Sequence, residues 1–415
     1  MSFPETQLRP LSAEERVHFA WLRRPPVQKI AAALDAREPG GSRFVGGCVR
    51  DSVIGATPKD IDIATVLVPT EVIAALEGAG LSAAPTGLEH GTVTGIADHV
   101  GVEITTLRAA VTTDGRRATV AFTRDWTIDA GRRDFRLNAI YLTFDGRLFD
   151  PVGGAEDARA GRVRFIGAAQ DRIREDYLRI LRFFRFSARF AQGFDAEGLG
   201  ACAAEANGLS ILSAERVGGE LCRILDLPNA ALAIDAMAAS GVLDAVWPAP
   251  PDRTSLRRLK EAYPAAPAPL GLAALFGETG AFSAGESLDR ALRLSNADGA
   301  RRKKALQAAA ALAAADTKGA RAALYRFGGQ AFEDGLMIAA ARGAAVDVDK
   351  MREIARTNAP PAFPFSGRHV VALGIAPGPE VDAILKATEA RWITEDFPST
   401  ERLQKLLEEV VAHRG

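Results

Sequence analysis

The chain has 415 residues, a net charge of −1 at pH 7, 47% hydrophobic residues and 25% charged residues. This length predicts two to four domains, and the composition is that of an ordinary globular protein. No apolar run approaches the ~18 residues of a membrane helix and the N-terminus lacks a secretory pattern, so we expect no membrane association. The three cysteines are too few for a disulfide framework, which favours the cytoplasm, and five histidines without a CxxC motif argue against a zinc site.

The first part of the chain is predicted to mix helices and strands. Apolar periodicity, β-branched runs and Gly or Pro boundaries give the element types. The expected elements, in chain order, are a helical lead-in (11–37), a strand ending in a glycine turn (42–47), a short helix (48–55), a strand (60–67), a helix (69–80) and a β-hairpin (91–97 and 101–108).

The remainder of the chain is predicted to be mainly helical. Residues 109–131 are polar and are expected to form a mobile loop, and residues 132–154 return to mixed helix and hairpin. After residue 171 the strand signals largely vanish, and proline-rich breaks lie near residues 250 and 360. We therefore predict an α+β fold, in which a mixed head is followed by an all-α part.

Two aspartates, Asp60 and Asp62, interrupt the apolar strand pattern. Because side chains alternate along a strand, both carboxylates are expected on one face, while Ile61 and Ile63 enter the core. Two carboxylates on one face repel each other unless a cation lies between them, and such oxygen ligands suit Mg²⁺ with phosphate and water oxygens. The alternative, which a bare pair of this kind fits more often, is two exposed aspartates on an edge strand.

A glycine pair precedes the aspartates by about fifteen residues. Gly46 and Gly47 stand before a predicted helix start, where free backbone N–H groups and the helix dipole favour a phosphate. Arg50 would lie one turn into that helix, near enough to reach an anion. The pair alone is a weak signal, but its combination with two aspartates is much rarer. Glu103, a third acid in an apolar strand, either completes a two-metal site for phosphoryl transfer or lies exposed.

Basic residues concentrate in one later segment. Nine arginines and only three acids lie between Arg159 and Arg189. Such a local stripe is a footprint for phosphates even in a neutral chain, whereas a solvated helix face is an equally good interpretation of the stripe by itself.

Four motifs follow one another in a specific order: GGCVRDSVIG…PKDIDIA from Gly46, RRDFRLNAIY from Arg132, EDYLRILRFFRFSARF from Glu175 and LSAERVGGEL from Leu212. They resemble the successive motifs of the class II tRNA nucleotidyltransferase and bacterial poly(A) polymerase family, within the polymerase-β-like superfamily. The resemblance covers residues 42 to about 225. Residues 367–385, GRHVVALGIAPGPEVDAIL, also resemble the tail of bacterial CCA-adding enzymes, with Asp382 where that family often has a glycine.

The resemblance implies a domain order and a set of site residues. The parts would be a nucleotidyltransferase head (1–170), a helical neck that recognises the base (171–250), a helical body (251–355) and a helical, tRNA-binding tail (356–415). Asp60 and Asp62 would bind Mg²⁺ and act in catalysis together with Glu103. The nucleotide site would comprise Gly46, Gly47, Arg50, Arg133, Asp134, Asp176, Arg179, Arg182 and Arg185.

The same resemblance implies individual roles in the nucleotide site. Arg133 and Asp134 would contact phosphate and the ribose 2′-hydroxyl, and Asp176 and Arg179 would face the Watson–Crick edge of the base. The chemistry is compatible, since Asp offers acceptors and Arg a rigid fork of donors that can pair with C or A. Asp176 and Arg179 are three residues apart, and the same spacing continues to Arg182 and Arg185. On a helix, these side chains form a stripe that drifts slowly around the axis.

The alternative for this helix is a surface held by ion pairs, for instance between Glu175 and Arg179. The side of the helix away from the stripe presents Tyr177, Ile180, Leu181 and Phe184, which can pack as core because helical spacing separates the two faces. The basic stripe would then serve stability and not recognition.

Two features guide the choice among relatives. The long segment 109–131 argues against an enzyme that adds only C, and the basic aromatic run of Gram-negative poly(A) polymerases is absent after the aspartates. We therefore expect a CCA-adding enzyme that uses CTP and ATP, contacts the tRNA acceptor stem and T arm, and needs no protein partner. An A-adding enzyme or a poly(A) polymerase are alternatives, and an inactive RNA-binding module or an enzyme acting on a small molecule is less favoured.

Overall fold

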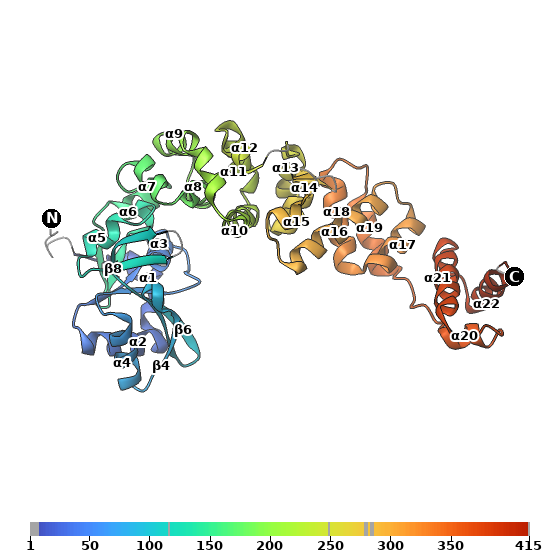
Figure 1. Ribbon diagram of the computed structural model, residues 1–415, viewed down its shortest axis with the longest axis horizontal. Coiled ribbons are helices and arrows are strands. Elements are labelled where there is room, and N and C mark those ends of the chain that lie inside the picture. The colour runs from blue at the N-terminus through green and yellow to red at the C-terminus, as the bar shows by residue number, and fades with distance from the viewer. Residues whose placement is uncertain (1–7, 115–116, 248–249, 278–280, 283–285, 414–415) are drawn as a thin grey trace. The chain divides into compact units, whose positions relative to one another are not determined.

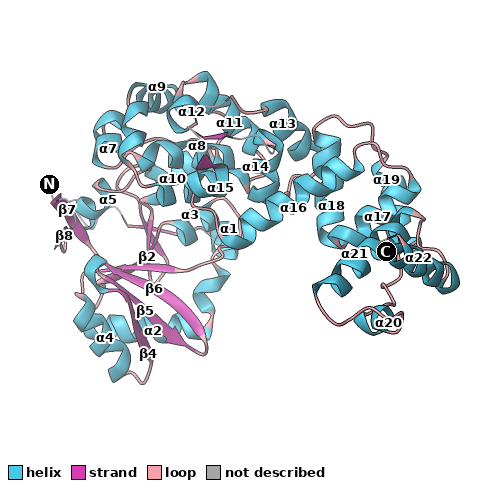
Figure 2. Cartoon of the chain, turned by 45° about the vertical axis from the view of Figure 1, so that its right-hand side comes forward, coloured by secondary structure: helices cyan, strands magenta, loops and turns pink. Residues whose placement is uncertain are grey.

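The computed structural model describes residues 8–114, 117–247, 250–277, 281–282 and 286–413. The chain divides into two compact units, one of Met1–Leu212 with Ala236–Val246 and one of Ser213–Asp235 with Trp247–Gly415. The large sheet belongs to the first unit, and the second unit is almost entirely helical (Figures 1 and 2). Within the described ranges, no helix is long and apolar enough to cross a membrane.

An eight-stranded mixed sheet is the framework of the first unit. Its strands are β1 (Arg9–Pro10), β2 (Ser42–Val45), β3 (Asp62–Thr65), β4 (Ser82–Gly87), β5 (Thr92–Ala97), β6 (Val100–Thr106), β9 (Tyr141–Thr143) and β10 (Arg147–Phe149). The order across the sheet is β1-β10-β9-β2-β3-β6-β5-β4. Strands β3 and β6 run parallel, whereas β5 and β6 pair antiparallel and confirm the predicted hairpin.

Strand β3 lies in the interior of this sheet, between β2 and β6. Ile61 and Ile63 are 8% and 1% exposed, as the alternation predicts. The parallel register places Asp62 opposite Glu103 of β6. Neighbouring strands lie ~4.8 Å apart, so the sheet brings these two carboxylates side by side although 41 residues separate them in sequence.

Two helices pack beside β5 at one side of the sheet. They are α2 (Pro25–Arg37) and α4 (Pro69–Gly78), and both begin with proline, which is preorganised for a first helical turn. The helices contact each other and β5. Their buried apolar side chains are Val27, Ile30 and Leu34 of α2 and Val72 and Leu76 of α4.

The segment predicted as a mobile loop, residues 109–131, contains regular structure, so that prediction was wrong. Strands β7 (Arg108–Asp114) and β8 (Arg117–Phe122) pair antiparallel, and α5 (Trp126–Gly131) follows. Residues 115–116 lie outside the described residues. The segment is polar, but threonines and valines flank an Asp-Gly dipeptide, which is a strong hairpin signal in a sequence.

The other helices of the first unit follow the helical periodicity of the sequence. They are α1 (Ala13–His18), α3 (Gly47–Val53), α6 (Gly154–Arg159), α7 (Ala169–Glu175), α8 (Leu178–Phe190), α9 (Ala196–Ala204) and α12 (Val242–Val246), with 3₁₀ turns at Ala20–Arg23, Leu88–His90, Arg136–Asn138 and Ala206–Ile211. The Phe183 ring of α8 stacks on Phe165 at 5.6 Å and is fully buried. Ile180, Leu181 and Phe184 are buried as predicted, whereas Tyr177 lies just before α8 and is only partly buried. The Phe183 ring also lies 6.3 Å from that of Phe135, so this aromatic core packs α8 against the residue that precedes the 3₁₀ turn Arg136–Asn138.

The second unit is built from helices that pack through small residues. It contains α10 (Ala214–Leu225), α13 (Arg253–Ala262), α14 (Ala268–Phe276), α15 (Leu288–Ala291), α16 (Asn296–Leu312), α17 (Thr317–Phe327), α18 (Gly329–Ala341), α19 (Val348–Thr357), α20 (Gly367–Val371), α21 (Pro379–Thr394) and α22 (Thr400–Ala412), with short strands β11 (Ala281–Phe282) and β12 (Glu286–Ser287), while α11 (Ala230–Ala239) crosses the boundary between the units. A Cβ at Gly335 would lie 2.6 Å from that of Ala308, so α16 and α18 approach closely.

Gly154, the first residue of α6, packs against the backbone of Arg136 and gives a test of the packing. A Cβ on Gly154 would lie 2.0 Å from the carbonyl oxygen of Arg136. Gly154→Ala is therefore expected to lower the free energy of unfolding by roughly 1–3 kcal/mol or more, because the backbone must shift. Urea unfolding measures this change. Gly200→Ala in α9, where nothing lies within 4 Å of the new Cβ, is the matched control, and equal midpoints for both variants would contradict the packing.

Candidate active site

A cavity of about 480 Å³ in the first unit gathers most of the residues that the sequence singles out. Its walls come from β2, β3 and β6, from the start of α3, from residues 132–138 and from the junction of α7 with α8. Ten of the twelve predicted site residues line it, namely Gly46, Gly47, Arg50, Asp62, Glu103, Arg133, Asp134, Asp176, Arg179 and Arg182.

The other two predicted residues, Asp60 and Arg185, are not among the lining residues. The strand predicted from residue 60 begins only at Asp62, and Asp60 is exposed just before it. The two aspartates remain close enough that the charge of Asp60 affects the pKa of Asp62. The Arg185 guanidinium lies over the Phe186 ring, 4.5 Å from its centre, and Phe186 itself lines the cavity.

Asp62 is a partly buried carboxylate at the start of β3. Burial raises its pKa, and repulsion from Glu103 and Asp60 raises it further, to about 6. A divalent cation would relieve this repulsion, and Mg²⁺ typically takes one or two carboxylates together with phosphate and water oxygens. Within the described residues, no group of three or more His, Cys, Asp or Glu side chains is arranged to hold a metal alone. The carboxylates therefore fit an ion that a substrate phosphate helps to bind.

The glycine turn before α3 forms a second wall. Gly46 has a φ of 69°, which favours glycine, and α3 begins at Gly47. Arg50 is 6% exposed, and its guanidinium donates to Asp51 Oδ1 at 2.9 Å and to Asn138 Oδ1 at 2.7 Å. Arg50 lies against the turn and is fixed by these contacts, so it adds positive potential beside the glycines.

A buried network under the cavity floor centres on Asp129, which is 1% exposed. Its carboxylate accepts hydrogen bonds from Arg132 Nε at 2.8 Å, from Arg133 at 3.0 Å and from the Tyr141 hydroxyl at 2.9 Å. Burial works to raise the pKa of Asp129, but the neighbouring guanidinium groups of Arg133 and Arg132 prevail and lower it to about 2. The network holds the two arginines in fixed positions at the cavity.

Asp129 gives a pH-dependent prediction. Its folded pKa of about 2 lies below its ordinary value of 3.8, so its contribution to stability is complete above pH 4 and is lost as the pH falls through 2. This contribution is roughly 2 kcal/mol. Asp129→Asn is expected to destabilise the protein by about 3–5 kcal/mol at pH 7, since it leaves buried arginines uncompensated. Urea unfolding between pH 7 and pH 2.5 should show a smaller pH dependence for the variant, and parallel curves would contradict the assignment.

Asp134 is paired across the cavity with α8. It is 8% exposed, and its carboxylate accepts from Arg182 Nε at 2.8 Å and from the Asn138 amide at 2.9 Å. Burial works to raise the pKa of Asp134, but Arg182 and the hydrogen bonds hold it below the usual range. This pair connects the segment after α5 to the arginine face of α8.

Asp176 and Arg179 stand at the junction between α7 and α8. Asp176 was expected on the same helix as the arginines, but α8 starts at Leu178 and the Asp176 carboxylate accepts from the Leu178 N–H at 3.1 Å. Aspartate near a helix start commonly accepts such bonds, which explains the difference. Arg179 donates to Glu175 at 2.7 Å, so the alternative ion pair is present, and to the Arg132 carbonyl at 2.9 Å. Both residues nevertheless line the cavity.

Several lining residues were not predicted as site residues: Thr105, Arg108, Arg132, Asn138 and Phe186. Arg132 and Asn138 belong to the RRDFRLNAIY motif, so the motif itself contained their signal. Arg108 is a charged residue at the end of the apolar strand that contains Glu103, and this position was its signal in the sequence. Their approach to the cavity depends on tertiary contacts.

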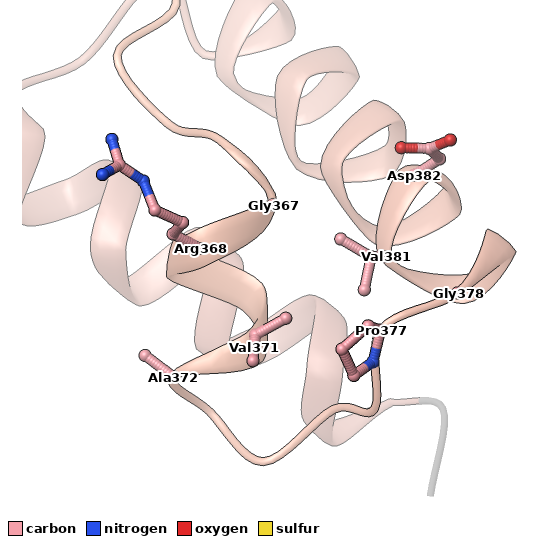
Figure 3. A pocket seen from close by; sticks show the side chains of 8 residues that line it. All are labelled: Gly367, Arg368, Val371, Ala372, Pro377, Gly378, Val381 and Asp382. Atoms are coloured by element: carbon pink, nitrogen blue, oxygen red, sulfur yellow. The ribbon is translucent and has the colours of Figure 1, made fainter.

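A second cavity, of about 610 Å³, lies in the tail motif between α20 and α21. Figure 3 shows Val371, Pro377 and Val381 facing one another across it, while the charged ends of Arg368 and Asp382 point away. Its apolar lining offers a contact surface and no cluster of reactive groups. The charged and polar groups that the sequence singles out therefore lie in the first cavity and not in this one.

The comparisons with known proteins concern the same regions of sequence. Residues 42–164 match the family described as Poly A polymerase head domain. The "CCA tRNA nucleotidyltransferase 1, mitochondrial" of Homo sapiens is 46% identical over 201 residues, which are 48% of this chain and 46% of that protein. The "CCA-adding enzyme" of Geobacillus stearothermophilus is 34% identical over 248 residues, 58% of this chain and 59% of that protein. The chain thus spans about half the length of the curated relatives it matches.

Solved structures match over a longer range. The crystal structure of the Bacillus stearothermophilus CCA-adding enzyme in complex with CTP has a TM-score of 0.71 at 26% identity and covers 94% of this chain and 99% of that chain. The Thermotoga maritima CCA-adding enzyme complexed with tRNA has a TM-score of 0.69 at 18% identity, with 98% and 99% coverage, and shows likeness of fold. The predicted α+β head followed by an all-α part is confirmed.

Proposed function

We propose that the chain belongs to the family of tRNA nucleotidyltransferases and poly(A) polymerases and that it is a CCA-adding enzyme. It would add C, C and A from CTP and ATP to the 3′ end of tRNA without a nucleic-acid template. Proteins that carry the name CCA-adding enzyme or CCA tRNA nucleotidyltransferase match at up to 46% identity, which supports this choice over a poly(A) polymerase.

The observation that carries the proposal is the composition of the first cavity. It combines four carboxylates, of which Asp62 and Glu103 lie side by side, with a glycine turn and several arginines. Such a site suits a nucleoside triphosphate, which has a large negative charge and needs a metal-binding edge. The 480 Å³ volume is within the range of ligand pockets.

The proposed roles follow the walls of the cavity. Asp60 and Asp62 would bind the ion and Glu103 would assist, while Gly46, Gly47 and Arg50 would face the triphosphate. Arg133 and Asp134 would meet phosphate and ribose. Asp176 and Arg179 would read the Watson–Crick edge, with support from Arg182 and Arg185.

The reaction is a nucleotidyl transfer. The 3′-hydroxyl oxygen of the RNA attacks the α-phosphorus of CTP or ATP, the bond from the α-phosphorus to the bridging oxygen breaks, and pyrophosphate leaves while the hydroxyl proton is released. The arginines orient the triphosphate and balance its charge, and the Asp134–Arg182 pair holds the sugar end of the cavity in place.

Enzymes of this family use a divalent metal ion, and we assign Mg²⁺ to this chain. Asp62 and Asp60 would hold it, since burial and the charges of Glu103 and Asp60 raise the pKa of Asp62 and are only partly offset by Arg133 and Arg50. When bound, the ion supplies activation of the attacking hydroxyl and stabilisation of the leaving pyrophosphate.

The remaining assignments also stay part of the proposal. The division into head, neck, body and tail at residues 170, 250 and 355 is retained, with the tail and body contacting the acceptor stem and T arm of tRNA. The cytoplasm remains the proposed location. An A-form stem would be held mainly through its phosphates and shape.

The experiment that tests the proposal uses purified protein, Mg²⁺ and labelled CTP or ATP. The acceptors are tRNAs that end before CCA, after the first C and after the second C. Addition of two C and one A followed by a stop supports a CCA-adding enzyme. Addition of A only to the acceptor that ends in CC indicates an A-adding enzyme, long A tails indicate a poly(A) polymerase, and no incorporation indicates an RNA-binding module.

A further inference from the structure

Arg108 lies at the start of β7, two residues after the end of β6, and its side chain lines the first cavity. Its backbone N–H donates to Asp129 Oδ1 at 3.1 Å, which ties the residue to the buried network under the cavity. The position of Arg108 beside the cavity is therefore fixed by a contact of its backbone.

The other cavity arginines have carboxylate partners, and Arg108 differs from them. Within the described residues, Arg50 donates to Asp51, Arg132 and Arg133 to Asp129, Arg179 to Glu175 and Arg182 to Asp134. The Nε of Arg108 is buried and has no hydrogen-bond partner among the described residues. A buried donor without a partner costs about 1–3 kcal/mol, so a group that accepts from it is missing from the protein alone.

The local charge points to an anion. Burial lowers the pKa of Arg108, and repulsion from Arg132 and Arg133, only partly offset by Asp129 and Glu103, contributes to a value of about 10. Three guanidinium groups near one another in a partly buried wall create a positive potential that an anion with several oxygens would neutralise. A phosphate matches the planar fork of a guanidinium and forms charge-assisted hydrogen bonds with it.

We propose that Arg108 binds a phosphate group of a substrate during nucleotidyl transfer, an inference that rests on the proposed function. Two sources of phosphate exist, the triphosphate of the incoming nucleotide and the last phosphodiester of the RNA acceptor. Across the sheet, β3 with Asp62 lies between β2, which leads into the glycine turn, and β6, which leads to Arg108. If the glycine turn takes the triphosphate, the opposite side favours the acceptor as the phosphate that Arg108 contacts.

The test compares Arg108→Gln, Arg108→Lys and the wild-type protein. The control is Arg147→Gln, which changes an exposed arginine on β10 that pairs with Asp145. Steady-state rates give kcat and separate KM values for CTP and for tRNA, and thermal unfolding of the protein without substrates gives Tm. We expect Arg108→Gln to raise one KM about tenfold or more, Arg108→Lys to restore part of the loss, and Tm to stay level or rise because the unpaired donor is gone.

The outcomes separate the possibilities. A raised KM for tRNA means that Arg108 contacts the last phosphodiester of the acceptor, whereas a raised KM for CTP means that it contacts the triphosphate. Either result supports phosphate binding by Arg108. Unchanged KM values for both substrates overturn the inference, whether or not Tm falls, and a lower Tm in that case shows a structural role. Wild-type incorporation in the same series tests the proposed function separately, so the two failures can be told apart.

Discussion

Asp62→Asn is expected to abolish nucleotide addition while tRNA binding persists. The substitution keeps the size of the side chain but removes the charge that would hold the ion at the α-phosphate, so incorporation should fall on the order of 10³-fold or more. Incorporation of labelled CTP measures the loss, and filter binding of tRNA measures what remains. Binding should be nearly unchanged, because most RNA contacts are expected through phosphates away from Asp62.

The same substitution has a second expected effect that a purely structural role would not produce. Burial and repulsion from Glu103 and Asp60 disfavour the charge of Asp62. Removal of this charge should therefore raise the Tm of the protein without substrates. Asp145→Asn, at an exposed aspartate paired with Arg147, is the matched control and should change neither quantity. Retained incorporation by Asp62→Asn would exclude Asp62 as a metal ligand.

Local sequence patterns were sufficient where a side chain depends on its own strand or helix. Ile61 and Ile63 alternate with the aspartates, and this alternation correctly places them in the core. Helical spacing likewise predicts burial of Ile180 and Leu181 on α8. The motif order then gave the resemblance to a family and most of the cavity residues, because each motif keeps its own local geometry.

Contacts between distant segments were not available from these patterns. Glu103 is exposed and also lines the cavity, because the parallel register aligns it with Asp62, and this register is a property of the whole sheet. Asp129 sits in a short helix whose sequence gives no sign that it compensates Arg132 and Arg133. Arg108 lines the cavity at the start of a hairpin that was predicted as a loop, and its backbone N–H bonds Asp129, 21 residues later in the chain.

Asp176 shows a different limit. The spacing of three residues to Arg179 suggested one continuous helix, but a side-chain acceptor that bonds the Leu178 N–H competes with the helical backbone at this point. The helix consequently starts later, and Asp176 lies in the turn beside the arginine face. Asp176 ends α7, and the turn between the two helices interrupts the predicted stripe.

Arg179→Ala is expected to weaken the choice between nucleotides more than it weakens tRNA binding. Arg179 lines the cavity with 15% of its side chain exposed, and its guanidinium is held by Glu175 and by the carbonyl oxygens of Arg172 and Arg132. A group held this rigidly can present donors to one set of base edges and reject others. Discrimination of CTP and ATP from UTP and GTP should therefore fall roughly 10–100-fold.

The measurement is kcat/KM for each of the four nucleoside triphosphates on tRNA acceptors that end before CCA and after CC. Arg174→Ala is the matched control, because Arg174 lies on α7, is 54% exposed and pairs with Glu205, yet does not line the cavity. The control should keep both the rates and the order of preference. Equal loss with all four nucleotides in the Arg179 variant would mean that its bonds to Glu175, Arg172 and Arg132 serve only to join α7 to α8, and that another residue reads the base.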